Sequence, residues 1–301
     1  MHAQSHRPNL IALAALALTV VIWAAFLVVT RAAMTGDFGP IEVGLIRFGT
    51  GALLFLPLIV RQGALPKGVS PLHLCVLPLF GGIGFLVPLS LGLSFAPVAD
   101  GGVFTPSMMP LYAALLAFAV LGERFARSQI LGFSLIVAGA VAVGGGTVLA
   151  GEPGDWRGHL LFTVASISWA IYTVGFRRSG LAPAHGAALL CFWSAVAFGM
   201  LGLFFGVSFE GIGVRALALQ FLLQGVLSGF VASYTYFYAV KIFGAARSAA
   251  AAALVPVLAA LGGAVFLGEA LGPAKALGIA VVVCGVALAS GGLRRSQRRL
   301  Q

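Results

Sequence analysis

Charged residues are scarce in this chain. Lys, Arg, Asp and Glu make up 9% of the 301 residues, whereas hydrophobic residues make up 60%. A soluble domain carries about 25% charged residues, so this chain has too few to cover a water-facing surface. Apolar runs of about 20 residues, each able to cross about 30 Å of hydrocarbon as a helix, recur along the whole length. Because a barrel would show short alternating segments instead, the sequence predicts an all-α integral membrane protein.

Acidic groups are rarer still, and each of them falls in a loop or near the end of an apolar run: Asp37, Glu42, Asp100, Glu123, Glu152, Asp155, Glu210 and Glu269. Many proton-driven carriers use a carboxylate at mid-membrane, so its absence makes simple proton antiport less favoured. The three cysteines lie far apart inside apolar runs. Neither a metal-ligand spacing, nor a phosphate-binding glycine loop, nor a nucleophile–base pair is recognisable. We therefore predict no enzymatic activity, no metal and no cofactor.

The net charge of +10 would suggest nucleic acid as a partner for a soluble protein. Here the basic residues lie in short loops and in the C-terminal tail, where positive charge sets membrane topology. We therefore expect the lipid bilayer and a small-molecule substrate as partners, no nucleic acid, and a monomer or homodimer.

The sequence repeats itself at a constant offset of 146 residues, which is the separation of Trp23 and Trp169. The offset needs no gap, and it also relates Arg31 to Arg177, Pro110 to Pro256, Leu121-Gly122-Glu123 to Leu267-Gly268-Glu269, and Gly139 to Gly285. We infer two units, residues 1–150 and 151–301. We expect ten spans at 10–30, 38–60, 72–94, 99–121 and 127–149, then 158–176, 184–207, 216–240, 244–267 and 273–292.

An odd number of spans per unit makes the second copy enter the membrane upside down relative to the first, as in transporters that are built from inverted repeats. Ten spans also place both termini on one side. That side holds most of the basic residues, and the other is left with Arg31, Arg157, Arg215 and Lys275. The bias predicts cytoplasmic termini in a multi-pass protein of the bacterial inner membrane.

One polar stripe stands out in the eighth span. At about 100° per residue, Gln220, Gln224, Ser228, Thr235 and Tyr238 fall near one line. Such a stripe would be costly against lipid. Two interpretations remain open: it lines a substrate cavity, or it joins neighbouring helices by hydrogen bonds.

Aromatic and hydroxyl side chains share faces of three other spans, and such mixed surfaces suit an amphipathic substrate. The candidate cavity residues are Trp23 in the first span, Thr105, Met108 and Tyr112 in the fourth, Trp169 and Tyr172 in the sixth, and Gln224, Ser228, Tyr234, Thr235 and Tyr238 in the eighth. A single Trp in a span also serves as a packing residue or an interfacial anchor.

Prolines are concentrated in the third and fourth spans, at Pro78, Pro88, Pro106 and Pro110, and Pro256 is the repeat partner of Pro110. Each removes a backbone donor and bends its helix, so we expect kink or gating positions there. The repeat partners of Pro78 and Pro88 are Gln224 and Tyr234. This divergence points either to the substrate path or to drift between old duplicates.

Arg47 is the one charge well inside a span. Its nearest acidic neighbour, Glu42, lies about 140° away around a helix and does not share its face. We expect a partner on another helix, or snorkelling of the guanidinium to the membrane surface.

Together these residues resemble the EamA unit of the drug/metabolite transporter superfamily. The resemblance is carried by Trp23 and Trp169, Ile46-Arg47-Phe48, Pro110 and Pro256, the two Leu-Gly-Glu motifs, and the glycines of the fifth and tenth spans. One departure is that the repeat partner of Arg47 is Trp193. The resemblance implies two inverted five-helix halves around a central cavity and alternating-access export or exchange of small metabolites.

Members of that superfamily carry amino acids, quaternary ammonium drugs, nucleotide sugars or triose phosphates. An aromatic-lined and nearly uncharged cavity favours amino acids with large apolar side chains. Our first interpretation is therefore that the chain is similar to the aromatic amino-acid exporters of this superfamily. A multidrug exporter of cationic compounds is the second. A non-transport membrane protein or enzyme is less favoured, because no catalytic constellation is visible.

Overall fold

The structure is a computed structural model that describes residues 9–149 and 155–290. The boundary between the two repeat units, at 150/151, lies outside these residues. Within them every regular element is helical. The elements are α1 (Leu10–Met34), α2 (Pro40–Gly44), η1 (Leu45–Gly49), α3 (Thr50–Leu54), α4 (Leu56–Gln62), α5 (Pro71–Val76), η2 (Leu77–Ile83), α6 (Gly84–Phe95), α7 (Val98–Gly102), η3 (Val103–Ser107), α8 (Met109–Leu121), α9 (Arg127–Leu149), α10 (Asp155–Ser179), α11 (Pro183–Phe205), α12 (Val214–Gln220), η4 (Phe221–Val231), α13 (Ala232–Phe243), α14 (Ala245–Ala252), α15 (Val255–Leu267) and α16 (Pro273–Ala289).

Eight helical stretches are long and apolar enough to cross a membrane. A ninth arises if Pro40–Leu54 and Leu56–Gln62, which bend by 59° at their junction, form one span. The last helix, Pro273–Ala289, is apolar but only 17 residues long. The protein is therefore an all-helical, multi-pass membrane protein, and the count of ten spans stays a prediction.

Four of the apolar stretches contain a π-helical segment in the described chain: η1, η2, η3 and η4. Pro78 lies in η2 and Pro106 in η3, whereas α6 continues through Pro88. Pro110 and Pro256 each stand at the start of a new helical segment, where the missing backbone N–H has no intrahelical partner to lose. The α-helix is thus interrupted near most of these prolines, and their role as kink or gating positions stays a prediction.

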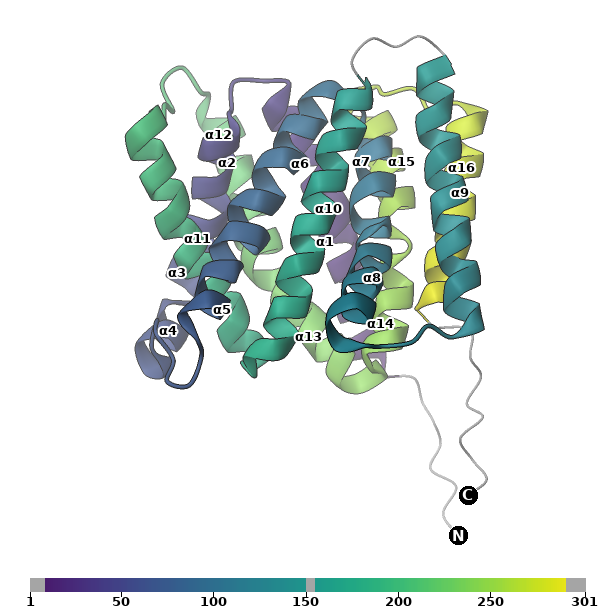
Figure 1. Cartoon of the computed structure of the whole chain (residues 1–301). Coiled ribbons are helices and arrows are strands. Elements are labelled where there is room, and N and C mark those ends of the chain that lie inside the picture. The colour runs from purple at the N-terminus through teal and green to yellow at the C-terminus, as the bar shows by residue number, and fades with distance from the viewer. Residues whose placement is uncertain (1–8, 150–154, 291–301) are drawn as a thin grey trace, which may run out of the picture.

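The described chain begins and ends on the same face of the bundle, shown at the bottom of Figure 1. We call this the terminal face and the opposite one the distal face. Helix α1 runs from the terminal face to the distal face, so Arg31, in its last turn, lies on the distal face. Helix α10 runs the other way, and Arg177, in its last turn, lies on the terminal face.

Two hydrophobic clusters hold the bundle together. One is built around α1, α6, α10 and α11, and the other around η3, α8, α9 and α16. Helices α9 and α16 lie side by side at one edge of the bundle (Figure 1) and approach through glycines. A Cβ atom at Gly139 would lie 2.7 Å from the carbonyl oxygen of Gly278, and one at Gly132 would lie 2.6 Å from that of Gly285. The glycines therefore permit the close approach of the two helices.

Candidate functional site

The two Leu-Gly-Glu motifs end helices α8 and α15 in the same way. Gly122 and Gly268 take left-handed conformations, with φ of 68° and 69°, which a residue without a Cβ atom adopts at no steric cost. The N–H of Glu123 then bonds back to Ala117 O at 3.4 Å, and that of Glu269 to Gly263 O at 3.2 Å. The glycine therefore reverses the chain and fixes the position from which the glutamate side chain extends.

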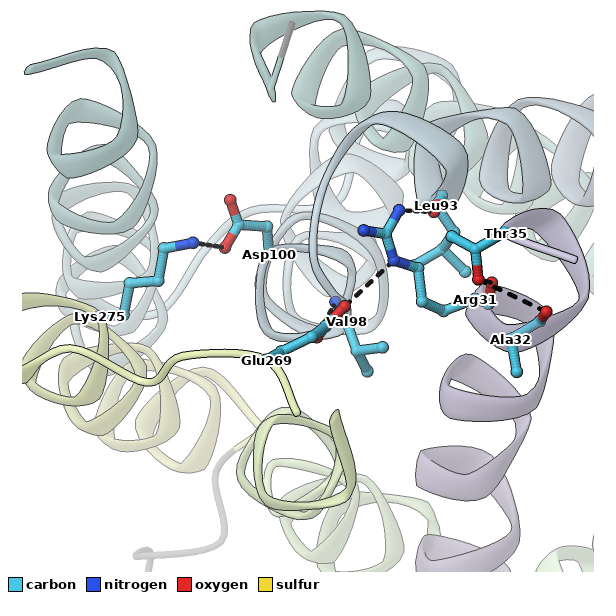
Figure 2. Close-up of polar contacts among 8 residues, drawn as sticks. All are labelled: Arg31, Ala32, Thr35, Leu93, Val98, Asp100, Glu269 and Lys275. Carbon is cyan, nitrogen blue, oxygen red and sulfur yellow. Dashed lines mark hydrogen bonds and ion pairs between the residues drawn. The ribbon is translucent and has the colours of Figure 1, made fainter. Parts of the chain in front are cut away.

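On the distal face, Glu269 joins the second half of the chain to the first. Its Oε1 accepts from Arg31 Nε at 3.1 Å, and its Oε2 accepts from the backbone N–H of Val98, at the start of α7, at 2.9 Å. Arg31 Nη1 in turn donates to the carbonyl oxygen of Leu93 on α6. We call these four residues the distal cluster; Figure 2 shows Arg31 between Glu269 and Leu93. The two charged side chains are 19% and 14% exposed.

A second ionic group lies beside the distal cluster. Its carboxylate, Asp100, is on α7, the short helix that begins at Val98. Asp100 is fully buried, and Lys275 Nζ lies 3.0 Å from its Oδ1 (Figure 2) while His159 Nε2 lies 2.7 Å from its Oδ2. The ring of Phe104 stacks on the imidazole at a centroid distance of 4.5 Å. We call Asp100, His159 and Lys275 the Asp100 triad. The 146-residue offset relates its members to Ala246, Leu13 and Gln129, so the terminal face has no equivalent triad.

On the terminal face, the repeat partners of Arg31 and Glu269 form the corresponding ion pair. Arg177 Nη2 donates to Glu123 Oε1 at 2.7 Å. These side chains are 51% and 47% exposed, far more than the distal pair. The offset thus relates two ion pairs that bridge the halves on opposite faces of the bundle.

Arg47 lies between the two faces in the π-helix η1. Its guanidinium carbon lies 4.2 Å from the ring centre of Phe26, and its Nη1 donates to Ser228 Oγ on η4 at 2.7 Å. The expectation of a partner on another helix is therefore confirmed. Arg47 is not among the predicted cavity residues, although a charge inside a span is a signal that could identify it.

An aromatic row crosses α1, α6 and α10 next to this arginine. The ring of Phe85 lies 6.5 Å from that of Phe26 and 4.7 Å from that of Trp169, which in turn lies 4.9 Å from Tyr172. Two predicted residues, Trp169 and Tyr172, are therefore brought together. Trp23 packs elsewhere, against Tyr236 at 5.0 Å.

The polar stripe of the eighth span engages α1 and η1. Gln220 Nε2 donates to Val29 O at 3.2 Å, Gln224 Nε2 donates to Thr30 Oγ1 at 2.8 Å, and Thr235 Oγ1 lies 2.7 Å from Thr19 Oγ1. These are the interhelical contacts of the second interpretation. The assumed spacing of about 100° per residue was wrong over Phe221–Val231, because this segment is a π-helix, whose wider turns shift each side chain around the axis. The role of the stripe in a cavity stays a prediction.

The remaining candidates are dispersed. Thr105 is buried, and its carbonyl oxygen accepts from Ser166 Oγ at 3.0 Å. Met108 belongs to the hydrophobic cluster of α9 and α16, with Tyr112 packed against it. Tyr238 is half-buried, whereas Tyr234 is 70% exposed.

An apolar groove of about 440 Å³ lies where η1 and α3 meet α11 and η4, and none of the predicted site residues lines it. Its lining residues are Leu45, Gly49, Thr50, Ala52, Leu53, Leu56, Phe192, Ala195, Val196 and Phe221.

Comparison with known proteins decides the family. The sequence profile of the EamA-like transporter family matches residues 10–145 and again residues 156–291. The chain belongs to the EamA-like transporter family. Both boundaries of the second match follow those of the first by 146 residues, which is the offset found within the sequence itself.

Similar proteins carry transporter names. The chain is 28% identical over 289 residues to the "Probable terminal-alkyne amino-acid exporter" of Streptantibioticus cattleyicolor, covering 91% of each protein. It is 29% identical over 200 residues to the "Biotin transporter" of Salmonella typhimurium, covering 63% of this chain and 64% of that protein. A solved crystal structure shares the fold with a TM-score of 0.64 at 23% identity, covering 92% of this chain and 96% of the other. This EamA-family member is therefore a membrane transporter that acts on a small molecule.

Proposed function

We propose that the protein is a secondary transporter that exports or exchanges small amphipathic metabolites, in the first place aromatic or other hydrophobic amino acids, by alternating access. The family and the transporter names of its relatives support the general class. The amino-acid exporter from Streptantibioticus cattleyicolor supports the substrate class.

The proposed topology has ten spans, arranged as two inverted five-helix repeats, with the terminal face in the cytoplasm of a bacterial cell and the distal face outside. The basic side chains concentrated at the terminal ends of the spans support this orientation. In it, Glu123 lies at the cytoplasmic face and Glu269 at the outer face.

The observation that carries the mechanism is the pair of repeat-related ion pairs. Arg31–Glu269 and Arg177–Glu123 each join one half of the chain to the other, and they lie on opposite faces. Opening the outer face requires Glu269 to leave both Arg31 and the N–H of Val98. Opening the cytoplasmic face requires Arg177 to leave Glu123. Inverted repeats supply two related conformations by exchanging the roles of their halves, so each pair is expected to close one side.

The substrate proposal rests on the aromatic row and on the few polar groups beside it. Apolar walls with a small number of oriented polar groups are the common form of a small-molecule site. A cationic-compound exporter of the same fold is the alternative, because aromatic faces also attract cations.

Reconstituted vesicles test the proposal. Preloaded with unlabelled phenylalanine, vesicles that contain the protein are expected to take up labelled phenylalanine or tryptophan by exchange, and protein-free vesicles are not. Trp169→Ala is expected to weaken uptake, with Trp156→Ala, an exposed tryptophan outside the aromatic row, as the matched control. Lack of exchange across a panel of amino acids would contradict the substrate class. Exchange of quaternary ammonium compounds instead would favour the alternative.

A further inference from the structure

Arg47 is a cation inside the bundle without an acidic partner. The ion pairs of the described residues involve Glu269, Asp100 and Glu123, and none of them involves Arg47. Its nearest carboxylate in sequence, Glu42, accepts instead from the backbone N–H groups of Gly39 and Ser208. A charged side chain within membrane-spanning helices is costly and marks a functional group.

The contacts that Arg47 does make compensate its charge only in part. Phe26 supplies one aromatic face, at 4.2 Å, and Phe48 a second, at 5.7 Å. Ser228 accepts one hydrogen bond, whereas the buried Nε of Arg47 has no hydrogen-bond partner in the described protein. A guanidinium presents five N–H donors in a planar fork that matches a carboxylate, so this group retains the capacity to bind one.

The neighbours of Arg47 provide the rest of an amphipathic site. Phe26 begins the aromatic row that continues through Phe85 to Trp169. One turn further along α1, Thr30 accepts from Gln224, whose buried Oε1 has no hydrogen-bond partner in the described residues and could accept from an ammonium group. A positive donor, a neutral acceptor and an aromatic wall are the groups that a free aromatic amino acid would need.

The backbone around this place is irregular on both sides. Arg47 lies in η1 and Ser228 in η4, both π-helical. Such segments occur often at functional sites, because they re-aim side chains that a regular helix would direct elsewhere. The repeat partner of Arg47 is Trp193, so the proposed site would occur once in the chain and not twice.

We propose that Arg47 binds the carboxylate of the transported substrate, with the row Phe26–Phe85–Trp169 beside its apolar part. This rests on the proposed function and deepens it, since it assigns the substrate class to organic acids and zwitterions and disfavours permanently cationic drugs. Ser228 then acts as a positioning residue that holds the guanidinium against Phe26.

Paired ligands test the proposal without relying on transport. Thermal unfolding of the purified protein is measured with phenylalanine, phenylacetate, phenylalanine methyl ester and phenethylamine. Wild type is expected to be stabilised by the two acids at concentrations roughly 10- to 100-fold below those needed for the ester or the amine. Arg47→Gln is expected to abolish this preference, and Arg47→Lys to keep part of it. Arg61→Gln, which removes an exposed cation at the end of the same span, is the matched control.

The preference for acid over ester is a ratio within one protein, so it remains measurable even if Arg47→Gln lowers stability. Equal ratios in wild type and Arg47→Gln, or a wild-type preference for the ester or the amine, would overturn the proposal. Exchange of labelled phenylalanine is measured on the same samples. A wild type that prefers phenylacetate yet exchanges no amino acid would contradict the proposed function and leave the carboxylate site standing.

Discussion

Both faces of the bundle carry an Arg–Glu ion pair at repeat-related positions, but the two halves of the chain make more polar contacts with each other on the distal face than on the terminal face. On the distal face, Glu269 binds both Arg31 and the N–H of Val98, and the Asp100 triad lies next to it on α7. On the terminal face, Arg177 and Glu123 meet as one ion pair that is about half exposed. The comparison teaches that the repeat keeps the ion pair on both faces, whereas the residues of the Asp100 triad have no counterpart at the repeat-related positions.

The ionic contacts of the two faces are expected to differ in how much they stabilise the fold, because those on the distal face are more buried. An ion pair at the surface contributes about 0–1 kcal/mol, because water and salt screen it and its side chains lose freedom. Removing one partner of a buried pair is far more costly, since the other charge is left without compensation. We therefore expect the contacts of the distal face to contribute more to stability than the ion pair of the terminal face.

Loss of the Asp100 carboxylate should have the largest effect. Asp100→Ala would remove a fully buried carboxylate and leave the largely buried Lys275 and His159 without their common partner, so the free energy of unfolding should fall by about 3–5 kcal/mol. Thermal unfolding in detergent measures this. Asp37→Ala, at an exposed position on the same face, is the control and should change little. A stability of Asp100→Ala equal to that of the control would show that the triad does not hold the distal face.

Loss of the Glu269 carboxylate should rank second. Glu269→Gln weakens two charge-assisted hydrogen bonds of a largely buried group, so a loss of roughly 1.5–3 kcal/mol is expected. The matched change on the other face, Glu123→Gln, should cost about 0–1 kcal/mol. Equal costs for the two variants, measured by the same thermal unfolding, would contradict the inequality of the faces.

The smallest effect is expected from exchanging the charges of the terminal pair. Arg177→Glu together with Glu123→Arg keeps an exposed pair of opposite charge, so stability and phenylalanine exchange should stay close to wild type. The corresponding exchange on the distal face, Arg31→Glu with Glu269→Arg, cannot reproduce the bond from Val98 N–H to a carboxylate and should reduce exchange. Normal exchange by the distal double variant would show that the Val98 contact is dispensable.

Much of this arrangement could be predicted from the sequence. The helical segments follow from hydropathy, and the family follows from the residues that carry the resemblance, most of which recur at the 146-residue offset. The residues of both ion pairs are also visible in the repeat, because Arg31 and Arg177, like Glu123 and Glu269, are identical residues separated by the offset. Their pairing was missed because Arg31 and Glu269 are 238 residues apart, and no local pattern shows which glutamate meets which arginine.

The site itself was less accessible to sequence reasoning. The eighth-span stripe was drawn on a regular α-helix, and the π-helix η4 moves its side chains to other angles. Arg47 stood out as a charge inside a span, but its aromatic contact and its lack of an acidic partner depend on helices packed together from distant parts of the chain. Asp100 lies near a span end, as expected, and its complete burial results from packing that hydropathy does not reveal.

The central claim is that the two ion pairs close opposite faces in alternation, and paired distances test it most directly. The three cysteines are replaced by alanine, and spin labels are then attached at new cysteines. On the distal face these replace Ala32 and Ala270, and on the terminal face they replace the repeat-related Arg178 and Arg124, all four being exposed positions. The distance between the two labels of each pair is measured by electron paramagnetic resonance spectroscopy, with and without Glu269→Gln. Our account predicts that Glu269→Gln lengthens the distal distance and shortens the terminal one. Distances that change in the same direction, or a distal distance that stays the same, would contradict it.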